Sequence, residues 1–392
     1  MRFLLLALVL AGRTAAGAAG ETWPEPPFEA ELGVASAYVR EGPNGQTTPV
    51  GLLVEGDRVR VTGCEPSCAA EGWALLGGDG AIRLRHLRPP GPVPPPERHL
   101  HGTVRRGGAP VHAAPDEASE VLSEVPARWV LSFLERPELL EREWLARPRG
   151  GFVRASRVRL ERPSTLSGER DPGGPIAFFR RKVRLPASDG EAPRTLGRYA
   201  RLPALGTDAA GRVRVEGGAV ERSAVRLAFA RPPPPRLPSG TRWVHVDLAE
   251  QVLTAYEGER WVYATLVSTG SAGRETLPGR FRVTQKLRHG DMCSRAWGYH
   301  VEEVPDVLYF QEDQGFHGTF WHDAFGAPVS HGCVNLAPAD AAWLFAWAPP
   351  RLPDGWHAVM PHRGQESLWV VVERSGPAWP AARPGPDPSA AR

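Results

Sequence analysis

Three histidines and one cysteine lie within the short segment FHGTFWHDAFGAPVSHGCVNL, residues 316–336. They are His317, His322, His331 and Cys333. Imidazole and thiolate groups can bind zinc, and a thiol can form a disulfide or act as a nucleophile. The spacings match no common zinc pattern, so zinc is a minor alternative. A disulfide between Cys333 and Cys293 is a second alternative.

A thiol nucleophile is the third interpretation. The reactive form is the thiolate, so the cysteine needs a nearby base and donors for the oxyanion. Gly332 permits a sharp backbone turn, and the N–H groups of Gly332 and Cys333 are natural oxyanion donors. His317 could act as the base from a neighbouring strand.

The run HGTFWHDAFGAPVSHGCVNLAPADAAWLFAW (317–347) resembles the catalytic signature of YkuD-type L,D-transpeptidases. That family carries an H-G motif, then S-H-G-C followed by an apolar residue and Asn or Arg. The resemblance extends over about 241–362 and includes the VSTG strand and the TLPGRF turn. It implies a β-rich catalytic domain that uses a cysteine thioester and needs no metal or organic cofactor.

The resemblance also assigns catalytic roles to individual residues. Cys333 matches the nucleophile, and His317 matches its base. Gly318 matches the residue whose backbone carbonyl orients that imidazole. Gly332 and Cys333 would supply oxyanion N–H groups, and His331 belongs to the frame of the nucleophile loop.

Other residues are expected to contact the substrate or brace the site. Ser330 and Asn335 match loop positions of the family motif, and Tyr299 matches a tyrosine that lines the oxyanion site. Trp321 and His322 lie between the two motifs. For these two, substrate contact and simple loop packing are equally open.

Two features depart from the family pattern. Ala337 stands where the family has Ser or Thr before the helix proline, and losing that cap should cost on the order of 1 kcal/mol of stability. Cys293, in GDMCSRAWGY, has no family counterpart. It could be a buried thiol, a reactive thiol or a redox partner of Cys333, and a buried thiol is the interpretation we favour.

The elements that must position these residues are mostly strands. WVHVDL (243–248) alternates with period two, and 251–270 reads as two strands around a turn at Glu257–Glu259. One helix is clear at 338–347, where Pro338 suits the first helical position. Residues 241–373 are therefore expected to form the catalytic domain.

An internal repeat precedes this domain. GAIRLRHLR, GFVRASRVR and GAVERSAVR begin at residues 80, 151 and 218 and share one pattern. The units, at 30–90, 100–162 and (more loosely) 175–230, resemble bacterial SH3-like domains, small β-barrels. A cell-wall-binding role and no binding role are equally open. The expected fold class is therefore mainly β, with tandem barrels before the catalytic domain.

Proline-rich stretches at 91–99 and 231–240 are expected to be semi-rigid linkers. Residues 1–20 read as a cleavable signal peptide, and 374–392 as a disordered tail. No later apolar stretch has membrane length. Export permits disulfides, and one between Cys64 and Cys68 is favoured. A formal net charge of +3 argues against nucleic acid as a partner.

Together these features predict an exported L,D-transpeptidase, in the periplasm or cell wall, that acts on peptidoglycan stem peptides. A wall-binding scaffold with an inert catalytic domain is the rival hypothesis. An L,D-carboxypeptidase, or an enzyme that attaches proteins to the wall, would use the same chemistry.

Overall fold

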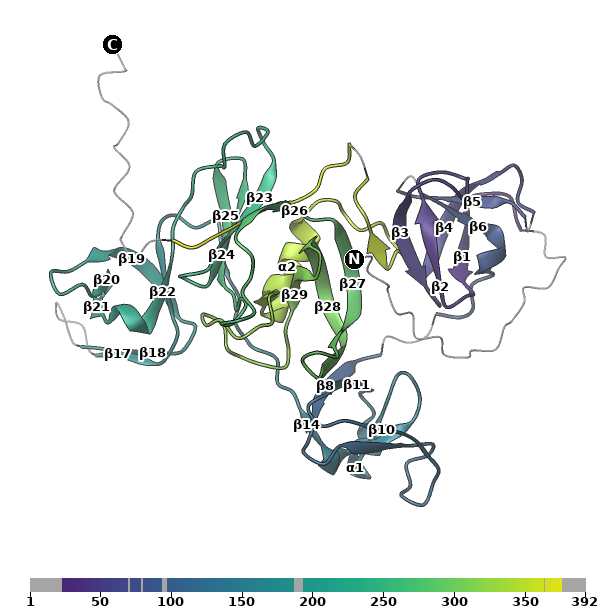
Figure 1. The fold of residues 1–392 in the computed structure, drawn as a ribbon, viewed down its shortest axis with the longest axis horizontal. Coiled ribbons are helices and arrows are strands. Elements are labelled where there is room, and N and C mark those ends of the chain that lie inside the picture. The colour runs from purple at the N-terminus through teal and green to yellow at the C-terminus, as the bar shows by residue number, and fades with distance from the viewer. Residues whose placement is uncertain are drawn as a thin grey trace, which may run out of the picture. The chain divides into compact units, whose positions relative to one another are not determined.

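The computed structural model describes residues 23–69, 71–78, 80–93, 97–186, 193–362 and 364–375. The expected signal peptide and nearly all of the expected tail lie outside these residues. The described chain is mainly β, as expected (Figure 1). The described residues divide into two compact units: those within 1–98, 284–290 and 350–366 form one, and those within 99–283, 291–349 and 367–392 form the other.

The first repeat, in the first unit, is a small antiparallel sheet of short strands. Its elements are β1 (Phe28–Leu32), β2 (Ser36–Arg40), β3 (Pro49–Val54), β4 (Arg58–Glu65), β5 (Trp73–Leu76), β6 (Gly80–Arg83), the 3₁₀ turn η1 (Leu84–His86) and β7 (Leu87–Arg88). The pairings are β1–β4, β1–β7, β2–β3, β2–β6, β4–β5 and β5–β6. Cys64 and Cys68 form a disulfide, with Cα atoms 5.1 Å apart.

The second repeat reproduces this topology in the second unit. Its elements are β8 (His99–Val104), β9 (Ala109–His112), β10 (Val121–Val125), β11 (Val130–Leu134), α1 (Pro137–Glu141), β12 (Trp144–Ala146), β13 (Phe152–Arg154), η2 (Ala155–Arg157) and β14 (Val158–Leu160). Taken in chain order, all six pairings of the first repeat recur.

The third repeat is the looser one, as expected. Its elements are β16 (Ile176–Phe179), β17 (Val183–Leu185), β18 (Arg194–Leu196), β19 (Arg201–Thr207), β20 (Val213–Val215), β21 (Gly218–Val220), η3 (Arg222–Ala224) and β22 (Val225–Ala228). Five of the six pairings recur among its described residues. Each repeated motif is thus a strand, a 3₁₀ turn and a second strand, so the internal repeat is structural. The SH3-like class stays a prediction.

The first repeat also contains a segment from the far end of the chain. Strand β31 (Ala358–Val359) pairs with β3, and Trp356 is 1% exposed within the core of this repeat. A Cβ built on Gly51 would lie 2.3 Å from the Trp356 ring, and one on Gly80 2.6 Å from it. Only glycine at these two positions leaves room for the indole.

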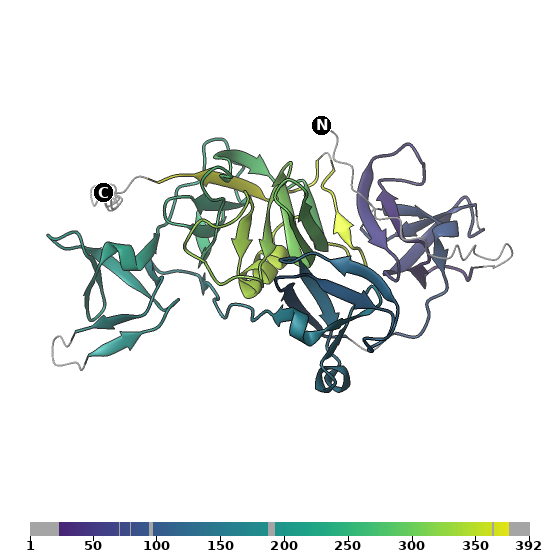
Figure 2. The same ribbon diagram turned by 60° about the horizontal axis from the view of Figure 1, so that its bottom comes forward.

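The catalytic region lies mostly in the second unit, and its stretches 284–290 and 350–366 belong to the first. One sheet has the order β15 (Glu169–Arg170), β25 (Arg260–Leu266), β24 (Val252–Glu257), β23 (Arg242–Asp247), β32 (Trp369–Glu373) and β26 (Gly279–Arg282). Strands β27 (Gln285–Ser294), β28 (Tyr299–Gln311), β29 (Gln314–Gly318) and β30 (Val334–Leu336) follow. Strands β28 and β29 pair in antiparallel fashion, and strands β29 and β30 pair in parallel. Figure 2 shows these strands from a second side.

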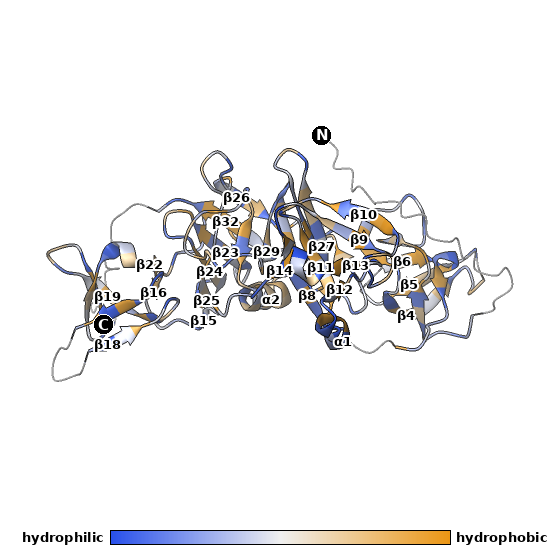
Figure 3. Cartoon of the chain, turned by 90° about the horizontal axis from the view of Figure 1, so that it is seen from below, coloured by the Kyte–Doolittle hydropathy of each residue, from blue (hydrophilic) through white to orange (hydrophobic). Residues whose placement is uncertain are grey.

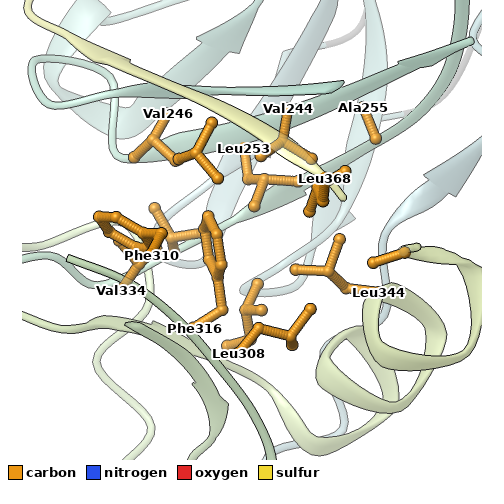
Figure 4. Packing of buried hydrophobic residues seen from close by; sticks show 14 of the residues in the cluster. Val244, Val246, Leu253, Ala255, Leu308, Phe310, Phe316, Val334, Leu344 and Leu368 are labelled. Atoms are coloured by element: carbon orange, nitrogen blue, oxygen red, sulfur yellow. The ribbon is translucent and has the colours of Figure 1, made fainter. Parts of the chain in front are cut away.

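Helix α2 (Pro338–Trp347) has the predicted bounds. Ala337 precedes it with no side-chain cap, as the sequence indicated. Leu344 packs with strand residues Phe316, Val334 and Leu253 in one buried core (Figure 4). Apolar and polar residues alternate along many strands (Figure 3), which lets one face of each sheet enter a core while the other stays polar.

Among the described residues, no helix combines the length and the apolar character that are needed to cross a lipid bilayer.

Candidate active site

Parallel pairing of β29 and β30 brings the two motifs together. Phe316 pairs with Val334, and His317 pairs with Asn335. Phe316 and Val334 are fully buried in the core (Figure 4). Because side chains alternate along a strand, His317 and Asn335 face the opposite side, and Cys333, just before β30, adjoins that same side.

His317 is held in one orientation. It is 2% exposed, and its Nδ1 lies 3.2 Å from the carbonyl oxygen of Gly318. A carbonyl only accepts, so Nδ1 carries the proton and Nε2 keeps its lone pair. The Trp321 ring stacks on the imidazole at 5.7 Å. Burial lowers the pKa of His317 to about 4, so the imidazole is neutral at pH 7. This is the geometry of an oriented base.

Cys333 is a free, half-buried cysteine. Its thiol donates to the carbonyl oxygen of Asp313 (Sγ···O 3.5 Å). Burial raises the thiol pKa to about 11; a backbone hydrogen bond from Gly315 lowers it, and the Asp313 charge raises it further. The resting thiol is therefore protonated at pH 7. Cys333 and His317 form a neutral thiol and imidazole rather than a preformed ion pair.

The nucleophile loop is closed by its own side chains. Ser330 Oγ donates to the carbonyl oxygen of Cys333 at 2.6 Å and accepts the N–H of Gly332 at 3.1 Å. Gly332 has φ +123°, a conformation that favours glycine. Its N–H is thus already bonded, so the predicted oxyanion role of Gly332 requires this bond to open. That role stays a prediction.

Two residues that sequence reasoning did not single out clamp this loop. Thr276 is 1% exposed; its Oγ1 donates to the carbonyl oxygen of Gly332 at 2.7 Å and accepts the N–H of Gly270 at 2.9 Å. The Gln314 amide lies beneath Gly332, where a Cβ would come within 3.0 Å of it. Thr276 belongs to the TLPGRF turn, so the motif was visible, but the role of its threonine depends on a contact 56 residues away.

His322 lies against Asn335. Its Nε2 is 2.8 Å from Nδ2 of Asn335, and its Nδ1 accepts the N–H of Ala324 at 3.2 Å. Burial lowers the pKa of His322 to about 4. These contacts support the loop-packing interpretation for His322, while substrate contact stays a prediction for His322 and Trp321.

His331 is exposed, and its ring lies 4.9 Å from that of Tyr299. Burial, followed by the charges of Cys333 and Cys293, raises the pKa of Tyr299 to about 12. The Tyr299 hydroxyl is therefore a proton donor throughout the neutral range and lies near both thiols. Its oxyanion role stays a prediction.

Cys293 is exposed and free. The favoured buried thiol is therefore wrong: the residue lies near the end of β27, at the open turn of a hairpin rather than under a sheet. Cys333 is also free, so no disulfide joins the two. Across the described ranges, no three His, Cys, Asp or Glu side chains are grouped so that they could hold a metal ion.

Comparison with known proteins gives this region a family. Residues 241–360 match the model of the YkuD family, the L,D-transpeptidase catalytic domain. No curated protein matches the chain.

The solved structures that are similar to the chain include the following three. The L,D-transpeptidase (Yku) from Stackebrandtia nassauensis is 27% identical, covering 38% of this chain and 62% of that one, with a TM-score of 0.27. Residues 123–326 of the L,D-transpeptidase from Xylanimonas cellulosilytica DSM 15894 are 25% identical, with 36% and 65% coverage and a TM-score of 0.27. The catalytic domain of the E. faecium L,D-transpeptidase is 22% identical, with 34% and 98% coverage and a TM-score of 0.26.

The alignment with the first two thus spans a little under two thirds of their length. Residues 241–360 therefore match the YkuD-type L,D-transpeptidase catalytic domain, and three strand-rich repeats precede them among the described residues.

Proposed function

We propose that this protein is an L,D-transpeptidase that acts on peptidoglycan stem peptides through a thioester on Cys333. The observation that carries the proposal is the pairing of β29 with β30 within the matched domain, which brings an oriented, neutral imidazole and a free thiol to one face. The order of the H-G motif (317–318) and the S-H-G-C motif (330–333) in the sequence supports the same proposal.

The first half-reaction forms the acyl-enzyme. Nε2 of His317 accepts the thiol proton as Sγ of Cys333 attacks the carbonyl carbon of the L-centre of a donor tetrapeptide. The C–N bond to the terminal D-residue then breaks, and His317 returns the proton to the leaving amine. A thioester remains on Cys333.

The second half-reaction releases the acyl group. An acceptor amine, such as a diamino acid side chain, attacks the thioester carbonyl and gives its proton to His317. The C–S bond breaks, and the sulfur recovers the proton. If water attacked the thioester instead of an amine, the reaction would be that of a carboxypeptidase. If the amine of another protein attacked it, that protein would become attached to the wall.

The electrostatics support proton transfer during attack rather than before it. A thiol with a raised pKa and an imidazole with a lowered pKa do not exchange a proton at rest. Substrate binding that expels water and places donors at the carbonyl oxygen makes the transfer favourable. Unpaired thiolate is therefore scarce, which protects an exported cysteine from oxidation.

The test uses the purified protein with a defined tetrapeptide and a diamino acceptor, followed by mass spectrometry of the products. We expect loss of the terminal D-residue, a new amide to the acceptor and a carbapenem adduct on Cys333. Cys333→Ala should abolish all three. Cys293→Ala is the matched control, because it removes the other free thiol, and it should stay active. Full exchange by Cys333→Ala would refute the nucleophile assignment.

We also propose that the protein is exported and works in the periplasm or cell wall, as the N-terminal sequence indicates. Wall binding by the repeats is a separate hypothesis. Sedimentation of the full-length Cys333→Ala protein with purified wall material tests it, since that variant should not turn over the wall.

A further inference from the structure

An exposed aromatic ring and a half-buried cation form a pair beside the nucleophile loop. Trp297, in the turn between β27 and β28, is 53% exposed, which is unusual for so large an apolar side chain. The guanidinium carbon of Arg274 lies 4.3 Å from the centre of its ring. The two residues come from different loops, so their contact is a tertiary one. At this distance the pair is a cation–π interaction.

This pair continues into the site through a row of rings. The Trp297 ring lies 5.9 Å from that of His331, and His331 lies 4.9 Å from the Tyr299 ring. His331 is two residues from Cys333, and the hydroxyl of Tyr299 responds to the charge of Cys333. An extended peptide bound over Cys333 could therefore reach the Arg274–Trp297 pair within a few residues.

Arg274 holds a charge that no acid neutralises. Within the part of the chain that the structure describes, its guanidinium contacts the Trp297 ring and no carboxylate. Its neighbour Glu275 uses its carboxylate to accept the N–H of Gly273 at 2.9 Å. The positive charge of Arg274 is felt at His331, whose pKa is lowered by burial first and then by Arg274. The planar donors of a guanidinium fit a carboxylate bidentately.

We propose that Arg274 and Trp297 form a binding site for a carboxylate of the peptide donor. This inference rests on the proposed transpeptidase function. Arg274 binds the carboxylate through its N–H groups, while the indole holds the guanidinium in place and covers the adjoining peptide. The carboxylate belongs either to the terminal residue that leaves or to an acidic side chain of the donor.

Steady-state kinetics with three donors test the site. One donor has all its carboxylates free, one is amidated at its terminus, and one is amidated on its side chain. Removing a hydrogen-bonded ion pair of this kind should lower kcat/KM by about 10–100-fold. Arg274→Gln should therefore raise KM for the free donor by about that factor, leave kcat largely unchanged and have no effect on the donor that lacks the bound carboxylate. Arg274→Lys should recover part of the loss.

Trp297→Ala should act in the same direction. Arg280→Gln is the matched control, since it removes an exposed positive charge from β26 in the same domain. Circular dichroism spectra verify that each variant is folded. An Arg274→Gln effect that is absent, or equal for all three donors, would overturn the proposal.

A binding measurement separates this inference from the proposed function. Calorimetric titration of the Cys333→Ala protein with each donor measures the binding affinity in the absence of turnover. If the wild type forms no product but donor binding still depends on Arg274, the carboxylate site stands and the transpeptidase assignment fails. If Cys333→Ala binds free and amidated donors equally, the site is refuted whatever the activity.

Discussion

Asn335, which is buried, and His322, which is half-buried, form a side-chain pair, with Nδ2 of Asn335 2.8 Å from Nε2 of His322. Ala324 donates its N–H to the other ring nitrogen, Nδ1. A neutral imidazole accepts at only one nitrogen, so Nε2 must carry the proton and donate. The partner of Nε2 is then the carbonyl oxygen, Oδ1, of the Asn335 amide; with the amide turned the other way, this Oδ1 would have no hydrogen-bond partner among the described residues. Asn335 pairs with His317 across β29–β30, so this contact braces the catalytic face.

Asn335→Ala should lower the free energy of unfolding by about 1–3 kcal/mol, because the half-buried His322 N–H loses its acceptor. Urea unfolding measures it. In the background of His322→Phe, which removes both polar groups, the same substitution should cost much less. Equal costs in the two backgrounds would show that the pair is not coupled.

The stability of the folded protein should depend on pH through His317 and Cys333. Burial lowers the pKa of His317 from 6.5 to about 4, so its contribution is present above pH 6.5 and is lost as pH falls through 4. The pKa of Cys333 is raised from 9.0 to about 11, so its contribution is present below pH 9 and is lost as pH rises through 11.

Urea unfolding across this pH range checks both signs. Relative to wild type, His317→Gln should flatten the acid side and Cys333→Ala the alkaline side. Alkylation of Cys333 by iodoacetamide should keep accelerating above pH 9. A plateau in that rate below pH 8 would contradict the protonated resting thiol.

Thr276→Val should loosen the nucleophile loop. It removes the hydroxyl that joins Gly332 to Gly270, and two buried backbone groups lose their partner, at a cost of about 1–3 kcal/mol. Turnover should fall with it, because the Gly332 backbone sets the position of Cys333. Thr254→Val is the matched control: the buried Thr254 hydroxyl has no hydrogen-bond partner among the described residues, so its loss should be neutral or stabilising.

Gly51→Ala should destabilise the first repeat, since the added Cβ would overlap the Trp356 ring. Trp356→Ala should cost about 3–5 kcal/mol by leaving a cavity in the same core. Hydrogen exchange should show lost protection in β1–β7 but not in β23–β25. Gly45→Ala, which meets no atom within 4 Å, is the control. Unchanged exchange in Trp356→Ala would contradict the role of Trp356.

Local patterns in the sequence were enough to predict several features of this protein. The motif order around Cys333 and His317 identified the family of residues 241–360, and proline at the start of an apolar run gave the bounds of α2. The repeated motifs indicated units that share a strand topology. Each of these signals is carried by residues close together in the chain, where backbone preference and side-chain periodicity act directly.

Features that depend on residues far apart in the chain are visible only once the chain is folded. Burial of His317 and of the Cys333 thiol sets their neutral resting state, and burial is the sum of contacts from several strands. The hydroxyl of Thr276, the placement of Trp356 in the first repeat and the stacking of Arg274 on Trp297 each join segments far apart in sequence. Composition and spacing do not encode such pairings, because the folded chain creates them by packing.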